Sequence, residues 1–283
     1  MTKRKSIVDL YKMKAQNEKV AWLTSYDFPT AQFAEAAGMD MILVGDSLGM
    51  CVYGYNGTVP VTMDQCIAHS EAVRRGAPST FLVGDMPFGS YQVSNEDAVA
   101  NATRFLKEAD VDCIKLEGGV RIADRIRSIA NAGINVCGHI GLTPQSSGQL
   151  GGHKAQGRTA ELAKLVVEDA LAVQDAGATL LLVEAVPPEV TRYIHTQLDI
   201  PVYSIGAGPH CDGQLLIVSD LIGQFQAFTP KFVKKYCNVA EMVTNAMREY
   251  VEEVKTVSFP DDKQYCYQMI EGEEVKFLKL MEK

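Results

Sequence analysis

Acidic side chains end several short apolar runs in this 283-residue chain, and they are the first candidates for chemistry. The sequence Leu-Val-Gly-Asp occurs twice and ends in Asp46 and in Asp85, while Glu117, His139 and Glu184 end three later runs. A single acid after a buried strand is commonly a helix cap or a turn residue. That interpretation explains each acid singly, but it makes the presence of acids at the ends of four of five successive apolar runs a coincidence. Because clustered like charges are costly without a cation, the set indicates a cation site.

The ligand types predict which cation this would be. Asp46, Asp85 and Glu117 offer only oxygen ligands, and no second histidine or cysteine pattern suggests zinc. Oxygen ligation favours Mg²⁺ or a similar hard ion, which keeps several waters, so one of the three acids could act through water. A 2-oxo acid could then chelate the ion through its ketone and carboxylate oxygens. The ion would stabilise the enolate formed when the neighbouring carbon loses a proton.

Lys115 lies two residues before Glu117, so in a strand both side chains point to the same side. A lysine inside a barrel is rare, and three roles are open. It could be a Schiff-base nucleophile, as in metal-free aldolases, a fixed positive charge for a substrate carboxylate, or a structural partner of a neighbouring acid. Beside a metal site we favour the fixed charge.

Three further residues complete the predicted site. Glu184 ends an apolar run and suits a general base, and Ser47 could donate to the substrate carboxylate beside Asp46. His139 could bond to the developing oxyanion or to a metal-bound water. Two glycine-rich segments stay open: Gly-Ala-Gly at 206–208 is an anion-binding turn or a plain tight turn, and 148–158 is a lid or a surface loop.

These residues fall on short apolar runs that alternate with helical patterns. The predicted strands are 20–24, 41–44, 81–83, 113–116, 135–138, 180–183, 202–205 and 215–218. The predicted helices are 30–37, 64–75, 95–108, 123–132, 160–176 and 188–197, and Gly38, Gly76, Gly133 and Gly177 are placed to follow helices. Eight strands with alternating helices predict a (β/α)8 TIM barrel, with a doubly wound open sheet as the alternative. In a barrel the candidate residues would converge on one mouth.

The composition excludes several other classes of protein. With 47% hydrophobic and 22% charged residues the chain is not disordered. A net charge of −8 argues against nucleic acid or an anionic membrane as the main partner. Seven cysteines without a C-x-x-C pair favour a reducing cytoplasm, and we expect no secretory signal and no membrane span. We expect one barrel domain over 1–283, with its core at about 20–225 and a C-terminal helical extension at 226–283 that includes a helix at 239–255.

Several motifs taken together resemble those of the ketopantoate hydroxymethyltransferase family. They are Thr24-Ser-Tyr-Asp27, Val44-Gly-Asp-Ser-Leu-Gly-Met50, Gly84-Asp-Met-Pro-Phe-Gly-Ser-Tyr91, Ile114-Lys-Leu-Glu-Gly-Gly119, Gly138-His-Ile-Gly-Leu-Thr-Pro-Gln145, Gly152-His-Lys-Ala-Gln-Gly-Arg158, Ile205-Gly-Ala-Gly208 and Cys211-Asp-Gly-Gln214. The resemblance implies a barrel of the phosphoenolpyruvate/pyruvate type with one Mg²⁺ per subunit. It implies hydroxymethyl transfer from 5,10-methylenetetrahydrofolate to 3-methyl-2-oxobutanoate, which gives 2-dehydropantoate in pantothenate biosynthesis.

The same resemblance assigns roles to residues by their place in the motifs. The metal ligands would be Asp46, Asp85 and Glu117. The substrate contacts would be Asp46, Ser47, Asp85 and Lys115, and the catalytic residues Glu184, the proton acceptor, and His139. The family also implies a cytoplasmic homo-oligomer, often a decamer. Two alternatives stay open: a folate-independent lyase or mutase acting on a 2-oxo acid on the same barrel, and a non-catalytic binding protein that has kept the fold.

Overall fold

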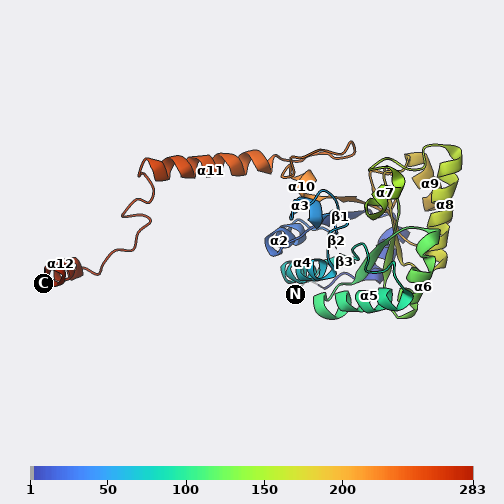
Figure 1. Cartoon of the computed structure of the whole chain (residues 1–283), viewed down its shortest axis with the longest axis horizontal. Coiled ribbons are helices and arrows are strands. Elements are labelled where there is room, and N and C mark those ends of the chain that lie inside the picture. The colour runs from blue at the N-terminus through green and yellow to red at the C-terminus, as the bar shows by residue number, and fades with distance from the viewer. Residues whose placement is uncertain (1–2, 283) are drawn as a thin grey trace.

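The computed structural model describes residues 3–282, which contain a closed barrel of eight parallel strands (Figure 1). Each strand pairs with its neighbours in chain order, and β1 pairs with β8 to close the barrel. The strands are β1 (Val20–Thr24), β2 (Met41–Val44), β3 (Phe81–Asp85), β4 (Cys113–Glu117), β5 (Val136–Gly141), β6 (Leu180–Glu184), β7 (Val202–Ile205) and β8 (Gly213–Leu216). The predicted TIM barrel is confirmed, and the open sheet is excluded.

Helices follow most strands and cover the outside of the barrel. The covering helices are α2 (Phe28–Ala36), α4 (Met63–Gly76), α5 (Asn95–Ala109), α6 (Ala123–Asn131), α8 (Ala160–Asp175) and α9 (Pro188–Gln197). Short helices stand in the connections: α3 (Leu48–Cys51), η1 (Val120–Ile122), η2 (Pro144–Ser146), α7 (Ser147–Leu150) and α10 (Val218–Leu221). Several helices begin where a side chain accepts a hydrogen bond from a free backbone N–H, as Asp27 does for α2 and Ser94 for α5.

Two hydrophobic clusters explain how the strands position the site. The larger cluster lies between the sheet and its helices, and the smaller one fills the barrel interior with alternate strand residues such as Leu43, Cys113 and Leu182. Helix α1 (Ile7–Ala15) adds Leu10 and Met13 to the interior cluster. Because side chains alternate along a strand, the positions two and four residues after an inward-facing residue also face the interior. The polar residues at the ends of β3 to β6 therefore point into the same barrel, while Asp46 reaches its mouth from the connection after β2.

The structure corrects several predicted boundaries. The last strand is Gly213–Leu216, not 215–218, because Gly213 pairs with Val20 and the Val218 N–H donates to the Thr24 hydroxyl as α10 begins. Gly38, Gly133 and Gly177 follow helices with positive φ as predicted. Gly76 does not, because it is the last residue of α4 and Ala77 ends the helix.

The C-terminal part of the chain leaves the barrel. Helix α11 (Val239–Lys255) has the predicted bounds, and it extends away from the barrel with α12 (Glu273–Met281) beyond it (Figure 1). No residue of α11 or α12 is buried, although Met247, Tyr250 and Phe277 are large and apolar. In Figure 1 the segment 257–282 lies away from the barrel. None of the helices in residues 3–282 is both long and apolar enough to cross a bilayer.

Candidate active site

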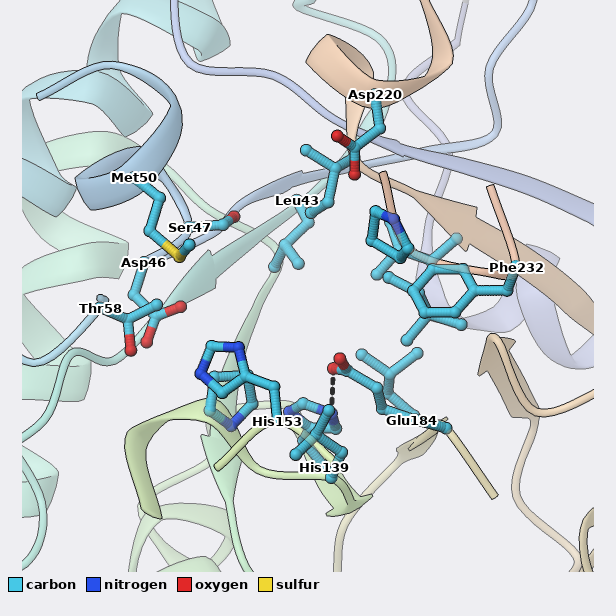
Figure 2. A pocket seen from close by; sticks show the side chains of 18 of the residues that line it. Leu43, Asp46, Ser47, Met50, Thr58, His139, His153, Glu184, Asp220 and Phe232 are labelled. Carbon is cyan, nitrogen blue, oxygen red and sulfur yellow. Dashed lines mark ion pairs between the residues drawn. The ribbon is translucent and has the colours of Figure 1, made fainter. Parts of the chain in front are cut away.

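A cavity of about 570 Å³ opens at the carboxyl ends of the strands. Its walls carry all seven residues that the sequence predicts for the site: Asp46, Ser47, Asp85, Lys115, Glu117, His139 and Glu184. In Figure 2, Asp46 and Ser47 lie on one side of the cavity, Glu184 and His139 at its base, and Asp220 and Phe232 on the remaining side. The structure therefore brings the predicted residues together from β2 through β6, as the barrel requires.

Three acids and one lysine form the charged inner end of the cavity. The Lys115 ammonium lies 2.7 Å from Asp85 Oδ1 and donates to Glu117 Oε1 at 3.1 Å. The Asp46 backbone N–H donates to Asp85 Oδ2 at 2.9 Å, which joins the ends of β2 and β3. All four side chains are buried. Lys115 thus has the structural pairing with neighbouring acids that the sequence left open, and its role as a fixed charge for a substrate carboxylate stays a prediction.

Burial and mutual repulsion set the charge states of these groups. Burial first, and then the charges of Asp85 and Glu117, raise the pKa of Asp46 well above its usual range. Burial also raises the pKa of Asp85, against the attraction of Lys115. Burial opposes ionisation of Glu117 as well, but Lys115 and His139 lower the pKa of that carboxyl to about 2. The acids together hold the pKa of Lys115 well above its usual range in spite of its burial.

The donor set fits a hard divalent cation. Asp85 Oδ1 is paired with the Lys115 ammonium at 2.7 Å, and because a carboxylate oxygen can accept more than one partner, it still has capacity for a cation. Both oxygens of Glu117 already have partners. Oε1 is bonded to Lys115 and His139, and Oε2 accepts from the Gln145 backbone N–H. Residues 3–282 contain no group of three or more His, Cys, Asp or Glu side chains placed to hold a metal by themselves. Mg²⁺ takes one or two carboxylates and otherwise binds water or substrate oxygens, so it does not need three protein ligands, and the predicted ligand set stays a prediction.

Glu184 and His139 form the second charged pair of the site. Glu184 Oε2 lies 3.1 Å from His139 Nε2, and Figure 2 marks this ion pair. The other ring nitrogen, Nδ1, lies 3.2 Å from Glu117 Oε1, so the imidazole bridges two carboxylates. Burial and Lys115 disfavour its charge, but Glu117 and Glu184 together raise the pKa of His139 to about 9. The Glu184 side chain is 15% exposed, against 1–3% for its neighbours in the cluster, so it is the acid most open to a ligand.

Gln145 is a site residue that the reasoning from residue types missed. Its amide Nε2 donates to Asp46 Oδ2 at 2.9 Å and to the Met86 carbonyl, and its Oε1 accepts from the Tyr91 hydroxyl at 2.7 Å. Its backbone N–H donates to Glu117 Oε2 at 3.0 Å. Gln145 thus holds two of the acids in place. Gln145 lies in the connection after β5, where a polar residue gives no periodic signal in the sequence. Only its position in the family motif identifies it.

Two further polar residues line the cavity without having been singled out. The Thr58 hydroxyl is buried and has no hydrogen-bond partner among residues 3–282, which leaves it free for a ligand. His153 and Ala155 reach the cavity from the glycine-rich segment 148–158, so this segment borders the site. The Ser47 hydroxyl is within 2.8 Å of the Tyr26 hydroxyl and shares the cavity wall with Asp46.

Two solved structures with the same architecture share little sequence with this chain. A phosphoenolpyruvate phosphomutase from Streptomyces platensis subsp. rosaceus is 13% identical, with a TM-score of 0.61, and the match covers 98% of this chain and 96% of that one. A 2,3-dimethylmalate lyase of the PEP mutase/isocitrate lyase superfamily is 18% identical, with a TM-score of 0.57 and coverage of 97% and 98%. At such identities the likeness shows the fold alone, which is the predicted (β/α)8 barrel.

The sequence comparisons are far more specific. The family model described as ketopantoate hydroxymethyltransferase matches residues 4–262. The 3-methyl-2-oxobutanoate hydroxymethyltransferase of Alkaliphilus metalliredigens is 68% identical over 282 residues, which cover 100% of this chain and 99% of that protein. The protein of the same name from Heliobacterium modesticaldum is 48% identical, with coverage of 92% and 94%. The chain therefore belongs to the ketopantoate hydroxymethyltransferase family, as its motifs predict.

Proposed function

We propose that this protein transfers a hydroxymethyl group from 5,10-methylenetetrahydrofolate to 3-methyl-2-oxobutanoate and so produces 2-dehydropantoate for pantothenate biosynthesis. The observation that carries the proposal is the placing of a partly open carboxylate, Glu184, across the cavity from a buried cluster of Asp46, Asp85 and Lys115. Full-length relatives at up to 68% identity are named for this reaction. A base facing a charge-stabilising cluster is what enolisation of a 2-oxo acid requires.

In this proposal Asp46 and Asp85 would hold a Mg²⁺ directly, and Glu117 would act through water. The ion would supply positive charge that stabilises the negative charge developing on the oxo acid. Gln145 fixes the orientation of the Asp46 carboxylate, and the Asp46 backbone N–H fixes that of Asp85. The protein residues therefore hold the two carboxylates in place before a ligand arrives, which reduces reorganisation during the reaction.

The oxo acid would lie between the acid cluster and Glu184. The Lys115 ammonium and the Ser47 hydroxyl would hold its carboxylate, and the Glu184 carboxylate would take the proton from C3. Electrons of the broken C3–H bond would pass to the C2 oxygen as the enolate forms. His139, which lies 3.1 Å from Glu184, would stabilise the ionised base before the transfer and orient it toward the substrate.

The carbon–carbon bond would form in the second half of the reaction. C3 of the enolate would attack the methylene carbon of the folate, and the bonds from that carbon to the folate nitrogens would break. Water would supply the oxygen of the new hydroxyl group, so that tetrahydrofolate and 2-dehydropantoate leave as products. We extend the proposal to a cytoplasmic protein that acts on small molecules only.

The test is proton exchange at C3, followed by NMR in deuterated water. With 3-methyl-2-oxobutanoate and Mg²⁺ alone, we expect exchange of the C3 proton without net product. Adding 5,10-methylenetetrahydrofolate should give 2-dehydropantoate. Absence of both exchange and product would refute the enolisation chemistry. Cleavage or rearrangement of the oxo acid without folate would favour the lyase or mutase alternative, and binding without turnover would favour a non-catalytic protein.

We also propose that the protein is a homo-oligomer, with a decamer implied by the family motifs. Exposed apolar side chains on α11, including Met242, Met247 and Tyr250, support an assembly because the barrel itself does not cover them. Light scattering on the purified protein would measure the mass of the assembly. A monomer at micromolar concentration would contradict this part of the proposal.

A further inference from the structure

The outer part of the cavity holds groups that the oxo-acid chemistry does not use. After α10 the chain contributes three phenylalanines to the cavity wall, Phe225, Phe228 and Phe232. Asp220, from α10 itself, adds a carboxylate on the same side. We call these four residues the aromatic subsite. A cavity of about 570 Å³ is far larger than a five-carbon oxo acid, so it has room for a second ligand.

Asp220 presents an unengaged carboxylate to this space. The residue is only 6% exposed, and Figure 2 shows both carboxylate oxygens on the cavity side of the backbone. None of the side-chain hydrogen bonds within residues 3–282 involves this carboxylate. Burial raises the pKa of the carboxyl, and the charge of Lys235 opposes that shift. Neither oxygen is among the fully buried polar atoms that lack a partner, so both can be reached from the cavity. A ligand that supplies donors there would stabilise the carboxylate.

The three phenylalanine rings line the same cavity as that carboxylate, and their own contacts hold them in place. Phe232 packs against Gly206, where a Cβ would lie 2.4 Å from the Phe232 ring and where φ is +67°. The glycine of the predicted turn at 206–208 thus makes room for this ring. Phe225 and Phe228 meet edge to face, with ring centres 5.4 Å apart and planes at 88°. The aromatic subsite therefore offers flat apolar walls and two acceptor oxygens, both from the Asp220 carboxylate.

We propose that the aromatic subsite binds the pterin ring of the folate co-substrate. This inference rests on the proposed function, and it assigns the half of the site that receives the one-carbon donor. The pyrimidine ring of a reduced pterin is flat, and its N3–H and 2-amino group form two parallel donors on one edge. The two oxygens of the Asp220 carboxylate match that edge, and the phenylalanine rings match its faces.

The surrounding charges agree with the rest of a folate molecule. Lys231 lines the cavity, and Lys231, Lys234 and Lys235, which flank Phe232 in the sequence, are all exposed to solvent. The tail of a folate carries glutamate carboxylates, which are anionic at neutral pH. With the pterin against Asp220, the tail would leave the cavity past these lysines. The methylene carbon would then lie between the aromatic subsite and Glu184, where the enolate needs it.

The experiment compares binding of tetrahydrofolate to the full-length wild type, to Asp220→Asn and to Asp199→Asn. The amide introduced by Asp220→Asn turns a donor toward the pterin edge, so we expect the Kd of this variant for tetrahydrofolate and its KM for 5,10-methylenetetrahydrofolate to rise at least tenfold. Asp199 is an exposed carboxylate between α9 and β7, outside the cavity, so Asp199→Asn should match the wild type within twofold. Folate-free proton exchange at C3 reports whether the oxo-acid half of each variant is folded.

A second variant, Phe228→Ala, removes a ring that is 48% exposed and so has little effect on folding. We expect it to raise the Kd for tetrahydrofolate about fivefold or more. If neither variant weakens tetrahydrofolate binding while the wild type forms product, the subsite assignment is wrong and the proposed function stands. If the wild type shows neither C3 exchange nor product, the proposed function has failed. If Asp220→Asn also abolishes proton exchange at C3, that variant no longer tests folate binding alone. The Kd of Phe228→Ala for tetrahydrofolate then decides whether the subsite assignment is kept.

Discussion

Replacing Glu184 with glutamine tests the proposed base with little change in shape. The variant keeps an amide oxygen that can accept from His139 Nε2, now 3.1 Å from the carboxylate. A hydrogen bond to a charged group contributes about 1.5–3 kcal/mol and a neutral one about 0.5–1.5 kcal/mol, so the free energy of unfolding should fall by about 1 kcal/mol. Loss of a general base should lower the turnover number about 10²–10⁴-fold, which is about 3–5 kcal/mol in the barrier.

The assay separates these two effects. Turnover is measured by formation of 2-dehydropantoate, C3 exchange by NMR, and stability by urea unfolding. We expect kcat and the exchange rate to fall together by at least 10², while KM for the oxo acid changes less than threefold. Glu184→Asp serves as the comparison, because its carboxylate keeps the charge on a side chain that is one methylene shorter. Its rate of C3 exchange should be higher than that of Glu184→Gln. Exchange within threefold of the wild type in Glu184→Gln would refute the assignment of the base.

Three other predictions follow from contacts in the structure. Asp46→Ala should weaken Mg²⁺ binding at least tenfold in calorimetric titration, and unchanged affinity would remove Asp46 from the ligand set. Burial opposes ionisation of Asp212, but donors led by the Val202 N–H lower its pKa. Its stabilising effect is therefore present above the ordinary aspartate pKa of about 4 and is lost as the pH falls through the lower folded value. Asp212→Asn should cost about 3 kcal/mol in urea unfolding at pH 7 and less below pH 4; a pH-independent cost would contradict this. Gly84→Ala places a Cβ 2.6 Å from the Phe105 ring and should cost about 2 kcal/mol, but much less when combined with Phe105→Leu; equal costs in both backgrounds would show that the ring is not the cause.

The sequence was sufficient to predict the residues that stand on strands. Period-two alternation puts Lys115 and Glu117 on one face, and parallel strands bring Asp46, Asp85 and Glu184 to one mouth, so the inner site follows from local rules. The last strand was placed two residues late, because its register is set by pairing with β1 and not by its own residues.

Residues in the connections could not be predicted in this way. Thr58 and Asp220 reach the cavity, and Gln145 reaches the Asp46 carboxylate, from segments without a hydrophobic period. Their positions depend on contacts made across the fold. Gln145 is fixed by partners on three other parts of the chain, which no local pattern records. The Mg²⁺ ligand set, the roles of the catalytic residues and the decamer stay predictions.

The order of strand pairing has a consequence for how the barrel forms. Seven of the eight strand ladders join neighbours in the sequence, but the ladder between β1 and β8 joins the first strand to the last. Loop-closure entropy makes such a long-range ladder slow to form. The barrel therefore cannot close until β8 has paired with β1. The acid cluster comes from β2 to β4 and can assemble earlier, while the chain is an open, twisted sheet. During synthesis, its carboxylates would repel one another in that sheet unless Lys115 has already paired with them. Lys115 would in that case help the sheet to fold by neutralising its neighbours.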